Sequence, residues 1–397
     1  MLISVEKIIP GNGTDSTSNA IHVADGIITR VGTIDELISE FPGEEVHRID
    51  GASLMPGLID MHMHLGYWWY KEDKQDYNDF LVAYLSLKQA ESFFEVGVTT
   101  VRETMSPHGL SKAMNLAAAK GYIRIPRIIP CDVGITMTGG HGHKGEGCIE
   151  VDGPWELRKA VRQLCKDGAQ WIKVLTSHRS ELPEFTQEEL DTVVDEAHRL
   201  GKKIAVHAGT STSIEMCINA GFDTIEHCTF VSEAQAIRMR DKGIAMVPTI
   251  ITYAYQYNYM VSLEKDMNAN PVAKAAVDIP YFGNAVQAYR DNFAKIANTG
   301  VIIATGTDLL MDDVPSSPVI GEMKLMVEFG VTPLKAIQFA TYNCALVMGL
   351  ENKFGQIREG AAADFLIVKG DPSKNINDMD NILEVYSGGE QVFQNCC

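Results

Sequence analysis

The segment LIDMHMHLG (residues 58–66) is the stretch on which the prediction of the fold depends, because an apolar run ends there in two histidines two residues apart. Side chains alternate faces along a β-strand, so His62 and His64 project to one side and the apolar residues between and after them to the other. Two imidazoles on one side of a strand end can bind one metal ion. The alternative is that two polar side chains simply end a core strand, and the segment alone is compatible with both interpretations.

The overall composition excludes several classes of partner. The chain has 397 residues, with 34 basic and 52 acidic side chains and a formal net charge of −18. Such a surface repels nucleic acid and anionic lipid, so we expect neither as a partner. No apolar run approaches the roughly 18 to 20 residues that a membrane-spanning helix needs, and the first residues, MLISVEKIIPGNG, lack a basic leader. The eight cysteines are scattered without a C-x-x-C spacing, which indicates reduced thiols and predicts a cytoplasmic protein.

From residue 54 onward, short apolar or β-branched runs alternate with amphipathic helical patterns, which is typical of βα units. Helix starts are marked by the capping-box pairs Thr186 with Glu189 and Ser232 with Gln235. The eight predicted strands are residues 54–64, 99–103, 127–138, 171–177, 203–208, 224–228, 244–249 and 301–308. Eight parallel strands with crossover helices predict an α/β fold of the (β/α)8 TIM-like barrel type, with its active site at the carboxyl ends of the strands.

The two ends of the chain differ from its middle. Residues 1–53 and 351–397 consist of short β segments and turns, and Asp25-Gly26 is a typical hairpin turn. We expect these ends to pair into one small β domain beside a barrel formed by residues 54–350. The longest stretch without periodicity, residues 250–283, is rich in Tyr and Asn and is predicted to be a lid or substrate loop.

Polar side chains recur at the predicted strand ends, where a barrel would bring them together. They are His62 and His64 on the first strand, Lys173 on the fourth, His207 on the fifth, His227 on the sixth and Asp308 on the eighth. Each has an ordinary alternative role, such as a core histidine or a helix cap, but burying six polar groups without partners is costly. Histidine and aspartate bind zinc-like divalent ions. A protonated Lys173 would repel a metal, so this amine either lies away from the ions or is chemically altered, for example to a carbamate.

These residues lie in motifs that resemble the amidohydrolase superfamily, and within it the imidazolonepropionase-like and Xaa-Pro-dipeptidase-like branch of binuclear metal hydrolases. The motifs cover nearly the whole chain in the family's order. They are MPGLIDMHMHLG (55–66), GVTTVRE (97–103), TGGHG (138–142), GAQWIKV (168–174), HAGT (207–210), AGFDTIEHC (220–228), ATGTD (304–308) and GQIREGAAADFLIV (355–368).

The resemblance implies a fold and a metal site. The fold is a (β/α)8 barrel with a small β-sandwich built from both chain ends. The site contains two divalent metal ions, expected to be Zn2+. By the same resemblance, His62, His64 and Asp308 bind the first ion, His207 and His227 bind the second, and an N6-carboxylysine at Lys173 bridges them. Asp308 would then move the proton during attack on an amide carbonyl.

Several further side chains are predicted to contact a small-molecule substrate. His141, in the Gly-rich loop TMTGGHGHKG, is assigned to stabilise the oxyanion because the resemblance places a histidine there; the alternative is a turn histidine facing water. His143 departs from the family pattern in the same loop. His178 and Arg179 could pair with a substrate carboxylate or lie in a solvated loop. Tyr255 represents an aromatic cluster that either lines the pocket or packs its own loop.

Three functions compete. The first is a hydrolase that cleaves a C–N amide bond in a dipeptide or an N-acyl amino acid. The second is a hydrolase for a cyclic amide, or a deaminase, although mononuclear deaminases of the superfamily use no bridging lysine. The third is a non-catalytic scaffold, which has no reason to retain six buried polar groups. A homo-oligomer is compatible with the resemblance, but the sequence contains no interface signature.

Overall fold

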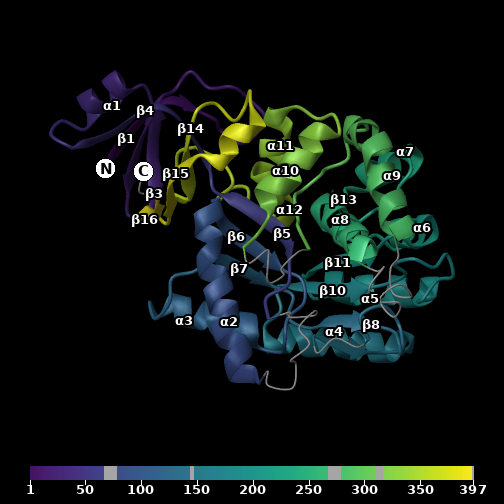
Figure 1. Ribbon diagram of the computed structural model, residues 1–397. Coiled ribbons are helices and arrows are strands. Elements are labelled where there is room, and N and C mark those ends of the chain that lie inside the picture. Colours follow the sequence, from purple (N-terminus) through teal and green to yellow (C-terminus); the bar gives the residue numbers. More distant parts are fainter. Residues whose placement is uncertain (67–77, 144–146, 267–278, 309–315, 396–397) are drawn as a thin grey trace.

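The fold is described from a computed structural model of the chain (Figure 1). The structure describes residues 1–66, 78–143, 147–266, 279–308 and 316–395. Strands and helices alternate through the middle of the chain, and both chain ends consist mainly of strands, so the predicted α/β class is confirmed. Among the described helices, none is long and apolar enough to cross a membrane.

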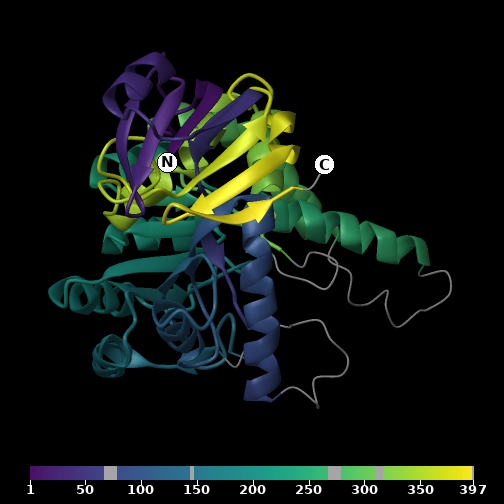
Figure 2. The same cartoon turned by 90° about the vertical axis from the view of Figure 1, so that its left-hand side faces the viewer.

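Both chain ends contribute to one seven-stranded sheet in the order β16-β15-β14-β4-β1-β2-β3. Its strands are β1 (Leu2–Ile8), β2 (Ala20–Ala24), β3 (Ile27–Gly32), β4 (Val46–Pro56), β14 (Phe365–Lys369), β15 (Ile382–Ser387) and β16 (Glu390–Gln394). The two ends meet where β4 pairs with β14, with Leu54 opposite Ile367, and Figure 2 shows the purple and yellow strands in one layer. The expected pairing of the ends is thus observed. The described strands of this part form one sheet, however, so the two-sheet sandwich is not confirmed.

The central strands form two parallel groups. The first is the three-stranded sheet β5 (Leu58–Met63), β6 (Val98–Glu103) and β7 (Arg127–Pro130). The second has the order β13-β12-β11-β10-β8-β9, with β8 (Gly134–Thr136), β9 (Cys148–Glu150), β10 (Trp171–Leu175), β11 (Lys203–Ala208), β12 (Thr224–His227) and β13 (Ala245–Val247). The described strands therefore do not form one closed barrel sheet. The predicted strand 127–138 is divided because Asp132 has a left-handed backbone (φ 64°) between β7 and β8.

The predicted eighth strand, residues 301–308, is not a regular strand but lies between the two parallel groups. It forms a single bridge, from Ile303 to Met246 of β13. On its other side, the backbone carbonyl of Thr305 accepts a hydrogen bond at 2.9 Å from the backbone N–H of Met61 in β5. The segment comes very close to β5 at Gly306, where a Cβ would lie 2.7 Å from Cβ of His62. Only glycine permits this approach, which places the next residues beside the first histidine.

Twelve α-helices are observed among the described residues, and most of them cover the parallel strands (Figure 1). They are α1 (Ile34–Glu40), α2 (Asp79–Ser92), α3 (Leu110–Ala119), α4 (Gly153–Asp167), α5 (Gln187–Arg199), α6 (Ser211–Ala220), α7 (Glu233–Lys242), α8 (Ile250–Asp266), α9 (Ile279–Asn298), α10 (Val319–Glu328), α11 (Pro333–Ala340) and α12 (Tyr342–Met348). The capping boxes predicted at Thr186 and Ser232 are both present. The main core lies between the central strands and these helices, and it includes Val193 of α5 and Val206 of β11.

The prediction of a long loop at residues 250–283 is wrong for its described part, which is helix α8 followed by the start of α9; residues 267–278 lie outside the described residues. The buried carboxylate of Glu322 in α10 accepts hydrogen bonds from the first backbone N–H groups of α8, at 3.0 Å from Ile250 and 2.6 Å from Ile251. A distant side chain thus caps this helix. The sequence shows no helical periodicity there because α8 contacts both α9 and α10.

Candidate metal centre

The structure brings all six predicted ligands to one place, at the carboxyl ends of the central strands. His62 lies in β5 and His64 directly after it, while the other ligands lie in β10 (Lys173), β11 (His207), β12 (His227) and residues 301–308 (Asp308). The side chains of His62, Lys173 and His227 are each only 1% exposed, while His64 and Asp308 are half-buried. The site is therefore an interior cluster in which two members are only half-buried.

His62, His64 and Asp308 form the first part of the cluster. Nε2 of His62 lies 3.1 Å from Nε2 of His64. Oδ1 of Asp308 lies 2.9 Å from Nε2 of His64 and 3.4 Å from Nε2 of His62. Burial raises the pKa of Asp308, but the two imidazoles outweigh burial and hold that pKa well below its usual value. The carboxylate is therefore ionised, as a metal ligand must be.

Four further histidines form the rest of the cluster. The rings of His207 and His227 have centroids 4.3 Å apart, and His141 stacks on His207 at 4.2 Å. Nδ1 of His178 lies 2.9 Å from Nε2 of His207. Burial lowers the pKa of His207 and His227 well below the usual value and that of His141 to about 4, so all three are neutral near pH 7.

The possible ligand atoms gather in two groups that differ from the predicted division. One group is His62, His227 and Asp308, and the other is His141, His178 and His207; within each group these atoms lie within 4.8 Å of one another. His227 therefore lies closer to the first predicted ion site than the sequence suggested. His178, predicted only as a substrate contact, lies among the candidate ligands.

Lys173 lies beside a buried pair of oppositely charged side chains, Glu226 and Arg102. Its amine donates a short hydrogen bond to Oε2 of Glu226, the residue before His227, and Oε1 of Glu226 accepts another from Arg102 in β6. The pKa of Glu226 is held well below its usual value, because His62, Lys173 and Arg102 outweigh the effect of burial. Glu226 and Arg102 were not predicted as site residues. Both lie inside family motifs, TIEHC and GVTTVRE, but strand alternation places Glu226 on the face opposite His227.

The backbone explains how Glu226 and His227 both come to face the site. His227 has a left-handed backbone, with φ 66°, which breaks the alternation at the end of β12. Asp308, the last residue of the segment 301–308, and Thr249, two residues after β13, have φ values of 51° and 52°. Such conformations are unfavourable for residues other than glycine, and they concentrate at functional sites.

The donor atoms fit divalent metal ions. Nδ1 of His64 lies 3.1 Å from the carbonyl oxygen of Met105, to which it donates, so the lone pair on Nε2 faces the cluster. Nδ1 of His227 lies 2.7 Å from the hydroxyl of Thr249. Nε2 of His227 is buried and has no hydrogen-bond partner among the described residues, as expected of an atom that serves as a metal ligand.

The predicted substrate contacts lie in different surroundings. His143 is exposed, and its Nδ1 lies 2.8 Å from the carbonyl oxygen of Gly140 in its own loop. Arg179 is exposed at the rim, with its guanidinium 4.5 Å from the ring of Tyr281 in α9. Tyr255 is half-buried and stacks on Tyr259.

Tyr253, rather than Tyr255, contacts the histidine cluster. Its ring lies 5.9 Å from that of His227 and 6.3 Å from that of His178. The side chain is 2% exposed, and its hydroxyl has no hydrogen-bond partner among the described residues. Residues two apart lie on nearly opposite faces of a helix, so Tyr253 and Tyr255 of α8 have different surroundings, and the predicted role of Tyr255 stays a prediction.

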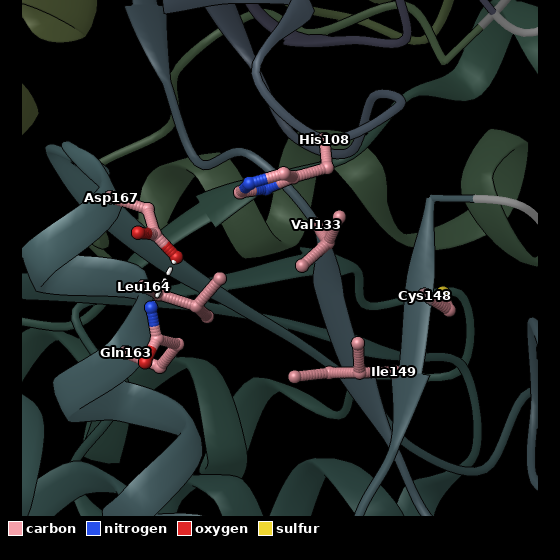
Figure 3. A pocket seen from close by; sticks show the side chains of 7 residues that line it. All are labelled: His108, Val133, Cys148, Ile149, Gln163, Leu164 and Asp167. Atoms are coloured by element: carbon pink, nitrogen blue, oxygen red, sulfur yellow. Dashed lines mark hydrogen bonds between the residues drawn. The ribbon is translucent and has the colours of Figure 1, made fainter.

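The remaining histidines, which have no predicted catalytic role, pair with carboxylates outside the cluster. The pairs are His22 with Glu44, His47 with Glu384, His108 with Asp132 and His198 with Asp223. A pocket of about 300 Å³ lies beside one of these pairs (Figure 3). It is lined by His108, Val133, Cys148, Ile149, Gln163, Leu164 and Asp167, and so by none of the six predicted ligands.

Comparison with known proteins identifies the family. The chain matches the amidohydrolase family over residues 53–392. The chain belongs to this family. The amidohydrolase is 29% identical to ochratoxinase of Aspergillus niger, over 98% of the chain and 86% of the relative. It is 23% identical to imidazolonepropionase of Bacillus cytotoxicus, over 88% of the chain and 82% of the relative.

Solved structures agree with this assignment. The fold of the amidohydrolase is similar to that of a Xaa-Pro dipeptidase with methionine bound in the active site, with a TM-score of 0.86, 30% identity and 99% coverage of both chains. It is also similar to that of A. niger ochratoxinase, with a TM-score of 0.83, 26% identity and coverage of 99% of this chain and 95% of the other. The predicted resemblance is confirmed, and the protein is a hydrolase that acts on carbon–nitrogen bonds.

Proposed function

We propose that this amidohydrolase cleaves the C–N amide bond of a dipeptide or an N-acyl amino acid. The observation that carries the proposal is the convergence of four histidines, one lysine and one aspartate on a single interior cluster. The likeness to a Xaa-Pro dipeptidase that holds methionine in its active site supports an amino acid as part of the substrate.

The proposal assigns two Zn2+ ions to the cluster. His62, His64 and Asp308 would hold one ion, His207 and His227 the other, and Lys173, as N6-carboxylysine, both. When bound, the ions supply an activated hydroxide and polarise the scissile carbonyl. We propose further that the three-stranded sheet, the six-stranded sheet and residues 301–308 surround one (β/α)8 barrel. In this barrel β7 and β8 together correspond to the predicted strand 127–138.

The chain's own residues supply the proton transfer and the binding. Asp308 is ionised in the structure and takes a proton at its carboxylate, which it then delivers to the leaving nitrogen. His141 is neutral, so its ring N–H can donate to the carbonyl oxygen of the substrate as negative charge develops there. The buried hydroxyl of Tyr253 is available as a second donor.

The substrate carboxylate is assigned to the rim. Arg179 lies there as an exposed cation, and its stacking on Tyr281 and Phe282, at 4.5 Å and 5.3 Å, holds it against α9. A guanidinium binds a carboxylate through two parallel hydrogen bonds. His178 is half-buried, and desolvation together with His141 and Arg179 keeps its pKa well below the usual value, so it contributes as a neutral donor or as a ligand. His143, in the Gly-rich loop, is proposed to contact the side chain of the substrate.

The test is hydrolysis measured with the metal-loaded enzyme on a panel of dipeptides, N-acyl amino acids and cyclic amides. Release of a free amino acid from the first two classes is the expected result. Preferential opening of a cyclic amide would favour the second candidate function, to which the similarity to imidazolonepropionase points. Absence of turnover on every class, in protein shown to contain metal, would exclude the proposed substrates.

A further inference from the structure

The buried pair of Arg102 and Glu226 lies directly beneath the predicted ligands. Both side chains are completely buried, and Arg102 is among the largest fully buried side chains of the protein. The pair joins β6 to β12, which belong to different sheets, and neither residue belongs to the predicted ligand set. A buried ion pair is not by itself a strong source of stability, because desolvation offsets the attraction. Its position beside the predicted ligands therefore suggests a functional role.

Glu226 contacts two of the predicted ligands through a single oxygen. Its Oε2 accepts the hydrogen bond from the amine of Lys173 and lies 2.6 Å from Nδ1 of His62. The contact between Nδ1 of His62 and this carboxylate is a short ion-pair distance, and Nδ1 makes no hydrogen bond of good geometry to any described residue. A carboxylate at Nδ1 favours the ring form that carries a lone pair on Nε2, and Nε2 is the atom that faces His64 and Asp308.

Arg102 fixes the carboxylate in turn. Its guanidinium donates to Oε1 of Glu226, to the hydroxyl of Thr224 at 3.1 Å and to the backbone carbonyl of Met61 at 2.7 Å. Its flat face lies over the ring of Trp171, with Cζ 4.6 Å from the ring centroid. The rigid guanidinium plane thus joins Glu226 of β12 to Met61 of β5, the residue before His62.

We propose that Glu226, held by Arg102, is a positioning residue that orients both His62 and Lys173 for metal binding. This inference rests on the proposed metal centre. Conversion of the lysine amine to a carbamate retains one N–H on Nζ, so Glu226 can accept a hydrogen bond from Lys173 in either form. The carboxylate therefore holds the lysine in place before and after modification, and it holds the imidazole whose ligand atom faces the same ion.

The test compares Glu226→Gln with Glu322→Gln, a matched variant of a second completely buried glutamate that lies outside the cluster and accepts backbone N–H groups. For each protein, metal content is measured by elemental analysis and metal affinity by competition with a chelating dye. The carbamate is measured by 13C NMR after incubation with labelled bicarbonate. We expect Glu226→Gln to lose about 10- to 100-fold in metal affinity and much of the carbamate signal, and Glu322→Gln to match the wild type.

Folding is monitored by circular dichroism, and if Glu226→Gln does not fold, Glu226→Asp replaces it. Aspartate keeps the charge but is one methylene shorter, so the same loss of metal affinity is expected. Unchanged metal affinity and carbamate signal in a folded Glu226 variant would overturn the inference and leave the proposed function intact. A wild-type protein that binds no metal would instead overturn the proposed function.

Discussion

Nε2 of His62 and Nε2 of His64 lie 3.1 Å apart and face the same carboxylate oxygen of Asp308. Burial lowers the pKa of His62, but the carboxylates of Glu226 and Asp308 outweigh burial and raise that pKa, so the imidazole holds a proton that a bound metal ion would displace. Two segments of the chain place these atoms together, and the close approach at Gly306 is what allows residues 301–308 to reach β5. The arrangement therefore has the form of a cation site.

Replacement of His64 by asparagine should lower metal content sharply, because it removes one of the three converging atoms that are proposed to bind the first ion. Elemental analysis of protein purified without chelator measures this. His143→Asn is the matched control, since His143 is exposed and bonded to Gly140 within its own loop. Equal metal content in both variants would contradict the placement of the first ion.

Lys173→Ala should lose both metal and hydrolytic activity if, as proposed, this side chain bridges the two ions. Acetate or propionate at millimolar concentration should restore part of the activity, since a free carboxylate can supply the missing oxygen ligand. Chloride at the same ionic strength is the control. Full metal content in the variant without added carboxylate would show that the lysine is not a ligand.

Tyr253→Phe should lower kcat/KM by about 10- to 100-fold if its hydroxyl donates to the substrate. The ring, which packs against His178 and His227, is kept, so the stability should change little. Tyr255→Phe provides the comparison, because Tyr255 stacks on Tyr259 instead. Equal values of kcat/KM for the two variants would show that Tyr253 only packs against the histidines.

Glu322→Gln should flatten the dependence of stability on pH between about 4.5 and 8. Burial raises the pKa of Glu322 from 4.5 to about 8, despite its two backbone hydrogen bonds. The folded protein therefore keeps a proton that the unfolded chain releases, so wild-type stability falls as the pH rises through this window, by at most about 1.4 kcal/mol per pH unit for one group. Denaturant titrations at pH 5, 6, 7 and 8 measure the two slopes, and parallel slopes would contradict this assignment.

Glu196→Gln should destabilise the protein at neutral pH, by about 1 to 3 kcal/mol. The carboxylate of Glu196 is buried on α5 and accepts hydrogen bonds from Arg162, Arg199 and Arg158, which lower its pKa to about 2. Its contribution is present above pH 4.5 and is lost as the pH falls through 2. Urea titrations at pH 7 and pH 3 test this, with Asp195→Asn as the control because Asp195 is 61% exposed.

Much of the fold could be predicted because its signals are local. The capping boxes at Thr186 and Ser232 and the hairpin turn at Asp25-Gly26 are confirmed. The helix that begins at Ile250 could not be predicted, because Glu322 caps it from 72 residues away and its aromatic side chains face more than one neighbour. Closure of the parallel strands into one sheet was also overestimated, because the left-handed residue Asp132 and the close contact at Gly306 interrupt regular pairing.

Local patterns in the chain were sufficient to indicate which residues lie at the strand ends, because alternation along a strand and the βα order require only neighbouring residues. They singled out His62, His64 and Asp308. The surroundings of these ligands, in contrast, depend on the tertiary fold. Arg102 and Glu226 are 124 residues apart and meet inside the protein, where the left-handed backbone at His227 turns two consecutive side chains toward one site. Such contacts depend on how strands that are distant in sequence are placed in space, so they cannot be predicted from the local pattern of residues.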